Sequence, residues 1–138
     1  MVLKKMENQT EEEFSLKTAR LRMLVLASEC MVAKEYQEAK TWLLNFLDTV
    51  GVETDAGKIL TEKYAEIESN YQKTIDENDK FLSYVMSHAG ENKVMDLVDF
   101  KPVTWQLHKN EEALKMFIRD FYKECWEIGH GWDLIPKK

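Results

Sequence analysis

The sequence has few residues that break or redirect a chain, with five glycines and two prolines among 138 residues. An all-β sandwich needs a turn signal roughly every 8–12 residues, and the sequence does not have that density. We therefore expect an all-α protein. The longest apolar run, residues 21–33, is shorter than the roughly 20 apolar residues that cross a bilayer, so we expect no membrane partner.

Cysteine is also scarce. Cys30 and Cys125 lie in apolar helical contexts, and neither has a second cysteine nearby, which favours two reduced, buried thiols over a disulfide or a zinc pair. Lys4 and Lys5 are followed by acidic residues instead of the apolar core of an export signal. We expect a cytoplasmic location, no cofactor and no metal.

Basic charge is in the minority, with 19 lysines and arginines against 25 acids and a net charge of −6. Binding duplex phosphates requires a concentrated basic face, so nucleic acid is an unlikely partner. Acids interrupt the basic residues near the C-terminus, and a nucleic-acid-associated subunit remains the second alternative function. That alternative would rely on Lys101, His108, Lys109, Lys115, Arg119 and Lys123.

The first helical region begins at Thr10, which can cap a helix whose first turn carries three glutamates. The region continues without glycine or proline to Gly51. Two structures fit residues 10–50: one continuous helix, or two helices with a tight turn near Lys34. We leave both open.

The hairpin alternative draws support from residues 26–47. The large and small residues of this segment fall in an order that resembles one tetratricopeptide repeat unit, although Phe46 stands where that family has a small residue. The resemblance implies two antiparallel helices with a turn just after Ala33. The matching positions are Leu26, Ala27, Tyr36, Ala39 and Leu43.

Three further helices are expected. Gly51 should end the first region, and Thr54 or Asp55 should cap a helix over residues 56–88. A short helix near 92–99 and a last main helix over 110–129 should follow. The helix over 56–88 carries a narrow seam with the four-three spacing of coiled coils. Its members are Leu60, Tyr64, Ile67, Tyr71, Thr74, Asn78, Phe81 and Val85.

These helices predict a single domain over residues 1–138, with 1–9 and 133–138 as looser ends. We expect an antiparallel bundle of three main helices, in which the first two form a long hairpin. The apolar stretch 21–33 should be buried on nearly every side, with the second and last main helices as its neighbours.

One spacing near the C-terminus is typical of metal chemistry. Glu127 and His130 form a Glu-x-x-His pair, which di-metal bundles use twice together with further glutamates. Only one such pair is present, and Gly129 is expected to end the helix and to aim His130 elsewhere. The apolar residues of the tail, 132–135, should fold back onto the bundle.

No motif marks a catalytic nucleophile, a phosphate-binding loop or a nucleotide fingerprint, and we lean against an enzyme. An alternative is a helical-bundle enzyme or small-molecule sensor with a pocket between the first and last helices. We expect Glu29 to share a solvent-facing stripe with Arg22. The residues available to such a pocket are Glu29, Cys30, Tyr122, Cys125 and His130.

Surface aromatics and polar seam residues are the candidates for binding a partner. Tyr122, Trp126 and Trp132 lie at the edge of the last helix's aromatic face, and such residues often anchor interfaces. Asn78 on the seam can fix register or oligomer state, and Tyr71 lies on the same seam. We predict a small cytosolic interaction or assembly protein, such as an adaptor, inhibitor or subunit, with a protein partner. A homodimer could close the seam.

Overall fold

The computed structural model describes residues 11–88 and 102–136. Within these ranges the chain forms four helices and no strand: α2 (Glu11–Val32), α3 (Tyr36–Val50), α4 (Asp55–His88) and α5 (Pro102–Gly131). The all-α class is therefore confirmed. The last helix begins at Pro102, eight residues before the predicted start at Asn110, and the predicted helix near 92–99 lies outside the described residues.

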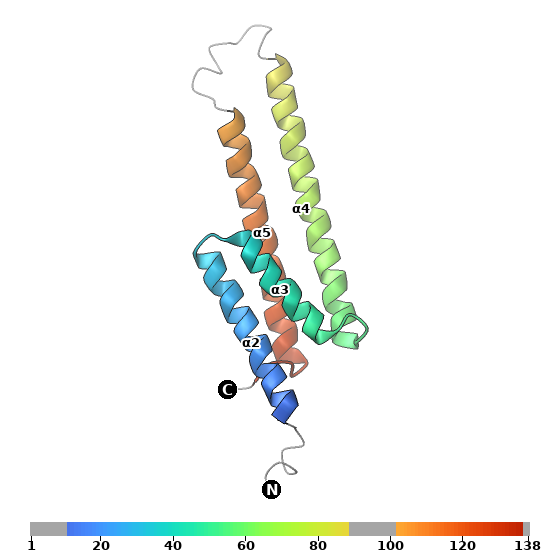
Figure 1. Ribbon diagram of the computed structural model, residues 1–138. Coiled ribbons are helices and arrows are strands. Elements are labelled where there is room, and N and C mark those ends of the chain that lie inside the picture. Colours follow the sequence, from blue (N-terminus) through green and yellow to red (C-terminus); the bar gives the residue numbers. More distant parts are fainter. Residues whose placement is uncertain (1–10, 89–101, 137–138) are drawn as a thin grey trace, which may run out of the picture.

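The helices pair as two antiparallel hairpins (Figure 1). One consists of α2 and α3, and the longer one consists of α4 and α5. The long hairpin was predicted between the first and second main helices; that pairing is wrong, because the first region folds back on itself. In the described residues α2 has no contact with α4, so the neighbours of residues 21–33 are α3 and α5.

The turn between α2 and α3 decides between the two structures left open by the sequence. Lys34 adopts a left-handed backbone conformation with φ of 64°. The N–H of Glu35 donates to the carbonyl of Cys30 at 2.7 Å, and the N–H of Lys34 donates to that of Met31 at 3.1 Å. This bonding is a Schellman motif, which ends a helix and reverses the chain.

The start of α4 is held by a side-chain cap. The Thr54 hydroxyl oxygen accepts the N–H of Gly57 at 2.9 Å and donates to the carbonyl of Gly51 at 2.7 Å, which confirms Thr54 as one of the two predicted caps. A Cβ at position 57 would lie 1.8 Å from the carbonyl oxygen of Gly51. Only glycine therefore fits at this close approach of two backbone segments.

The end of α5 differs from the prediction. The helix continues through Gly129 to Gly131, and a second Schellman motif follows, with Asp133 at φ 57° and the N–H of Leu134 donating to the carbonyl of Gly129 at 2.9 Å. The chain then returns to the bundle, where Ile135 is only 2% exposed. Ile135 packs directly on Gly129, since a Cβ there would be in ordinary van der Waals contact with two Ile135 carbons at 3.5 Å.

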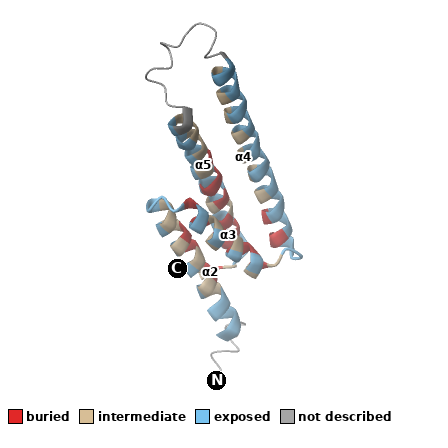
Figure 2. Cartoon of the chain, turned by 45° about the horizontal axis from the view of Figure 1, so that its top comes forward, coloured by how far each residue is buried: buried red, intermediate tan, exposed pale blue. Residues whose placement is uncertain are grey.

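The core contains residues from all four helices and from the C-terminal tail (Figure 2). Of residues 21–33 only Leu24 and Ala27 are buried, and Val32 is 82% exposed. The expectation that this stretch is buried on nearly every side is wrong, because α3 and α5 cover one side of α2 and leave the other open. The buried cluster consists of Leu24, Ala27, Tyr36, Ala39, Leu43, Phe46, Leu47, Val50, Ala56, Leu60, Phe117, Ile118, Phe121, Cys125, Ile128 and Ile135.

The far part of the α4–α5 hairpin extends beyond this core. No residue from Thr61 to Ser87 is buried, nor is any of residues 104–112. Within α4, Figure 2 shows buried residues only at the start of the helix. We call residues 74–87 of α4 together with 104–112 of α5 the projecting hairpin. It is the part of the described chain that depends least on burial for its position.

Candidate functional site

Two polar pairs and one aromatic pair join the helices of the projecting hairpin. The Asn78 amide nitrogen donates to the Asn110 amide oxygen at 3.2 Å. The Gln106 amide donates to the Asp79 carboxylate at 2.8 Å, while Phe81 and Trp105 pack with ring centroids 5.0 Å apart. These paired polar groups fix the register of α4 against α5, because a shift of either helix would separate them.

The same hairpin exposes large apolar side chains. Phe81 is 48% exposed, Tyr84 61%, Met86 54% and Leu107 66%. Phe81 and Tyr84 are three residues apart in a helix and therefore lie on one side of it. Thr74, the seam residue at the start of the projecting hairpin, is exposed as well.

A hollow of about 530 Å³ lies where the projecting hairpin meets the α2–α3 turn. We call it the α5 groove. Its lining residues come from the turn, the first turn of α3, α4 and α5. We call the apolar and aromatic ones (Tyr36, Tyr71, Leu107 and Leu114) the floor and the charged ones (Lys34, Glu35, Glu38 and Glu111) the rim. The lining residues are Lys34, Glu35, Tyr36, Gln37, Glu38, Tyr71, Leu107, Asn110, Glu111 and Leu114.

Tyr71, one of the sequence-predicted site residues, lies at the centre of this region. Its ring stacks on Phe117 with centroids 5.0 Å apart and an interplanar angle of 24°. It lines the α5 groove and also a smaller hollow of about 110 Å³ that includes Ile67 and Met116. Tyr71 is therefore part of the wall that separates the two hollows.

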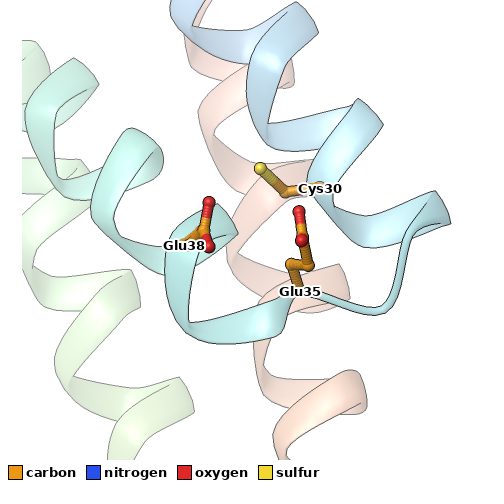
Figure 3. A group of neighbouring side chains, drawn as sticks. All are labelled: Cys30, Glu35 and Glu38. Carbon is orange, nitrogen blue, oxygen red and sulfur yellow. The ribbon is translucent and has the colours of Figure 1, made fainter.

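Three potential metal ligands converge beside the α2–α3 turn (Figure 3), and two of them, Glu35 and Glu38, also line the groove. The Cys30 sulfur and one carboxylate oxygen each from Glu35 and Glu38 lie within 4.8 Å of one another. Cys30 and Glu35 meet because they occupy the positions that a Schellman motif brings together. The sequence did not reveal this cluster, since it exists only if the chain turns at Lys34.

The chemistry of the Cys30 cluster is that of a protonated thiol. Burial raises the pKa of Cys30, and the negative charges of Glu38, Glu35 and Glu29 raise it further. The thiolate is the form that acts as nucleophile and metal ligand. A thiol surrounded by carboxylates is therefore a weak nucleophile. The raised pKa of Cys30 indicates that negative charge is concentrated around its sulfur.

The predicted aromatic edge of α5 forms a row of contacting rings along the helix. Tyr122 stacks on Trp126 with ring centroids 6.2 Å apart, and Trp126 packs against His130 at 4.5 Å. His130 Nδ1 donates to the carbonyl of Trp126 at 3.0 Å, which holds His130 in this row of rings. Trp126 and Trp132 are 38% and 46% exposed. Of the predicted partner-binding residues, Tyr122 and Trp126 therefore contact each other on α5, whereas Asn78 contacts Asn110 and Tyr71 contacts Phe117.

The residues named for a pocket between the first and last helices do not gather around either described hollow. Glu29 and Arg22 are exposed on α2, as expected for a stripe that faces solvent. Cys125 is fully buried, and burial followed by the charge of Glu124 raises its pKa far above the usual thiol range. Neither described hollow therefore supports this enzyme or sensor alternative, which stays a prediction.

The basic residues proposed for nucleic-acid binding are partly paired within α5. His108 lies 3.4 Å and Lys109 3.7 Å from the Glu112 carboxylate. Lys101 lies outside the described residues. Pairing with acids lowers the positive potential of this face, and the nucleic-acid alternative remains a prediction.

Comparison with known proteins finds no matching family model, no similar curated protein and no similar solved structure. Among the described helices none is long and apolar enough to cross a membrane. The function must therefore be inferred from the geometry of the projecting hairpin and the α5 groove.

Proposed function

We propose that this chain is a small cytosolic interaction or assembly protein that binds a protein partner through the projecting hairpin and the α5 groove. The observation that carries the proposal is the exposure of Phe81, Tyr84, Met86 and Leu107 on a part of the chain that contains no buried residue. Free cysteines at positions 30 and 125 support a reducing compartment such as the cytosol.

Burying the exposed apolar side chains of the projecting hairpin against a partner would be energetically favourable. Fully burying a Leu, Met or Phe side chain contributes about 1.5–3 kcal/mol, and these side chains are about half exposed. A partner that covered all four would gain several kcal/mol from this contact alone. The register pairs, including Asn78–Asn110, hold the surface in place before binding, which lowers the entropic cost of association.

A homodimer is one form that this function can take. The seam of α4 first suggested it, and α5 now covers part of that seam, since Leu60 is buried and Tyr64 and Tyr71 pack on aromatic rings of α5. Beyond Tyr71, the seam residues Asn78 and Phe81 pair with Asn110 and Trp105 of α5. A two-fold contact would therefore have to use the exposed side chains of the projecting hairpin. Sedimentation analysis at micromolar concentration measures this directly, and a monomer under these conditions would exclude it.

The test compares a surface variant with a matched control. Y84E/M86E places two charges on the projecting hairpin, and V25E/V52E places two charges at exposed apolar positions elsewhere. Circular dichroism and thermal unfolding should be unchanged for both. Quantitative capture from native lysate should then lose its specific proteins with Y84E/M86E and keep them with V25E/V52E.

A capture profile that both variants leave unchanged would remove the projecting hairpin as the binding surface. Loss with both variants would show that added charge, and not this surface, controls the capture. Either result would overturn the proposal.

A further inference from the structure

We infer that the α5 groove binds a basic amphipathic helix of a protein partner, with its apolar face on Leu107 and Leu114 and its lysines or arginines against the glutamates of the rim. The inference rests on the proposed function and specifies the chemistry of the partner. Its support comes from the shape of the groove, its apolar floor and its charge.

The groove lies at the start of α3, one of the protein's own helices. α3 packs against both α4 and α5, and its first residue, Tyr36, is 7% exposed and lines the groove. Beyond Tyr36 the wall consists of Tyr71 from α4 and of Leu107 and Leu114 from α5. The groove therefore has lining residues from both helices that α3 packs against, next to the first residue of α3.

The floor suits a helix and not an extended strand. Leu107 and Leu114 are seven residues apart on α5, about 10.5 Å along its axis, which matches the i to i+7 spacing of apolar anchors on a bound helix. Leu107 is 66% exposed, so it is free to contact a partner, while Leu114 is partly buried. Strand addition requires a sheet edge, and the described chain contains no strand.

The rim selects for positive charge. Glu35, Glu38 and Glu111 line the groove against one ammonium group, that of Lys34. The carboxylates of Glu35 and Glu38 are near enough to the Cys30 sulfur to raise the pKa of that thiol in addition to the effect of burial. Complementary potentials steer binding and suppress wrong partners, so a basic helix is preferred here over an acidic one.

Charge also argues for a different protein in the groove in preference to a second copy. Each copy carries a net charge of −6 and would present the same acidic rim. Like charges that face each other across an interface are unfavourable.

The experiment uses the full chain and two labelled helical peptides of about 18 residues, each with leucines at i, i+3, i+4 and i+7. One peptide has lysines on both flanks of the leucines, and its twin has glutamates there. Fluorescence anisotropy should show binding of the lysine peptide only. L107N should weaken it about tenfold, as loss of an interface anchor does.

A charge-matched pair of variants tests the rim. E35Q/E38Q/E111Q should weaken the lysine peptide about tenfold at low salt, and the difference from the unaltered chain should shrink at high salt. E12Q/E62Q/E66Q removes the same charge from exposed positions outside the groove and should leave the affinity within about twofold.

Three results would overturn the inference: equal affinity for both peptides, equal weakening by the two triple variants, or self-association of the chain that L107N abolishes. The proposed function is tested separately. If capture from lysate is lost with Y84E/M86E while neither peptide binds, the hairpin is a binding surface and only the basic-helix chemistry is wrong.

Discussion

The guanidinium of Arg20 binds Thr49 twice, donating from Nε to the hydroxyl at 3.2 Å and from Nη2 to the carbonyl at 2.9 Å. A third bond runs from Nη1 to the carbonyl of Leu134 at 3.2 Å. Arg20 is 9% exposed, and burial lowers its pKa from the ordinary arginine value. One buried cation therefore ties α2 to the end of α3 and to the C-terminal tail.

Replacing this cation should destabilise the fold. R20M keeps an apolar stem of similar length but leaves two backbone carbonyls without their charged donor. Since hydrogen bonds to charged groups contribute about 1.5–3 kcal/mol net, we expect the free energy of unfolding to fall by about 2 kcal/mol. Urea denaturation measures the change. R22M, at an exposed position of the same helix, should stay within about 0.5 kcal/mol, and equal losses would show that the Arg20 bonds contribute nothing specific.

The turn at Lys34 predicts the opposite effect. A residue with a β-carbon at φ 64° carries a strain of about 1–2 kcal/mol that glycine does not, partly offset by the greater freedom of glycine in the unfolded chain. K34G should therefore raise the free energy of unfolding by about 0.5–1 kcal/mol. K34A retains the β-carbon and serves as the control. If K34G is no more stable than K34A, Lys34 is not left-handed and the hairpin of α2 and α3 is wrong.

These two residues show what the sequence could and could not predict. The helical class and the α4 seam follow from composition and spacing, because a repeat of fours and threes is specific to helices. The turn could not be decided, since the usual glycine signal is absent and a lysine occupies the strained position. The start of α5 was predicted at Asn110, which instead lies inside the helix and pairs with Asn78. The helix begins at Pro102, in the first helical position that proline favours.

The candidate site was predictable only in part, for the same physical reason. Tyr71 and Asn78 could be proposed as candidates because they lie on the seam, which a local repeat reveals. The acidic rim was missed, because Glu35 meets Cys30 only after the chain has turned. A site that depends on a tight reversal of the chain leaves no periodic signal in the sequence.

The close approach of Gly57 to Gly51 gives a third prediction. In G57A the new Cβ would lie 1.8 Å from the carbonyl oxygen of Gly51. This oxygen belongs to the backbone and cannot move aside as the end of a flexible side chain can. We expect a loss of about 2–3 kcal/mol, at the upper end of the usual cost of overpacking, measured by thermal or urea unfolding. In G131A the Cβ would meet no atom within 4 Å, so this helical position should tolerate alanine or gain up to about 1 kcal/mol. Equal tolerance at both positions would contradict the loop geometry at the start of α4.

The carboxylates beside Cys30 give a prediction in pH. Negative charge favours the neutral thiol, so Glu38 and Glu35 hold the pKa of Cys30 above its ordinary value together with burial. Neutralising both in E35Q/E38Q should therefore move the midpoint of thiol titration to lower pH and speed alkylation at any pH below that midpoint, because only the thiolate reacts. The protein is alkylated with iodoacetamide across a pH series, and mass spectrometry quantifies the fragment that contains Cys30. The pH dependence gives the midpoint of thiol titration, whereas the accessibility of the sulfur changes only the maximal rate. E62Q/E66Q, which removes two carboxylates from exposed positions on α4, is the control. A midpoint that does not move in E35Q/E38Q, or moves equally in the control, would show that the three side chains do not converge as Figure 3 shows.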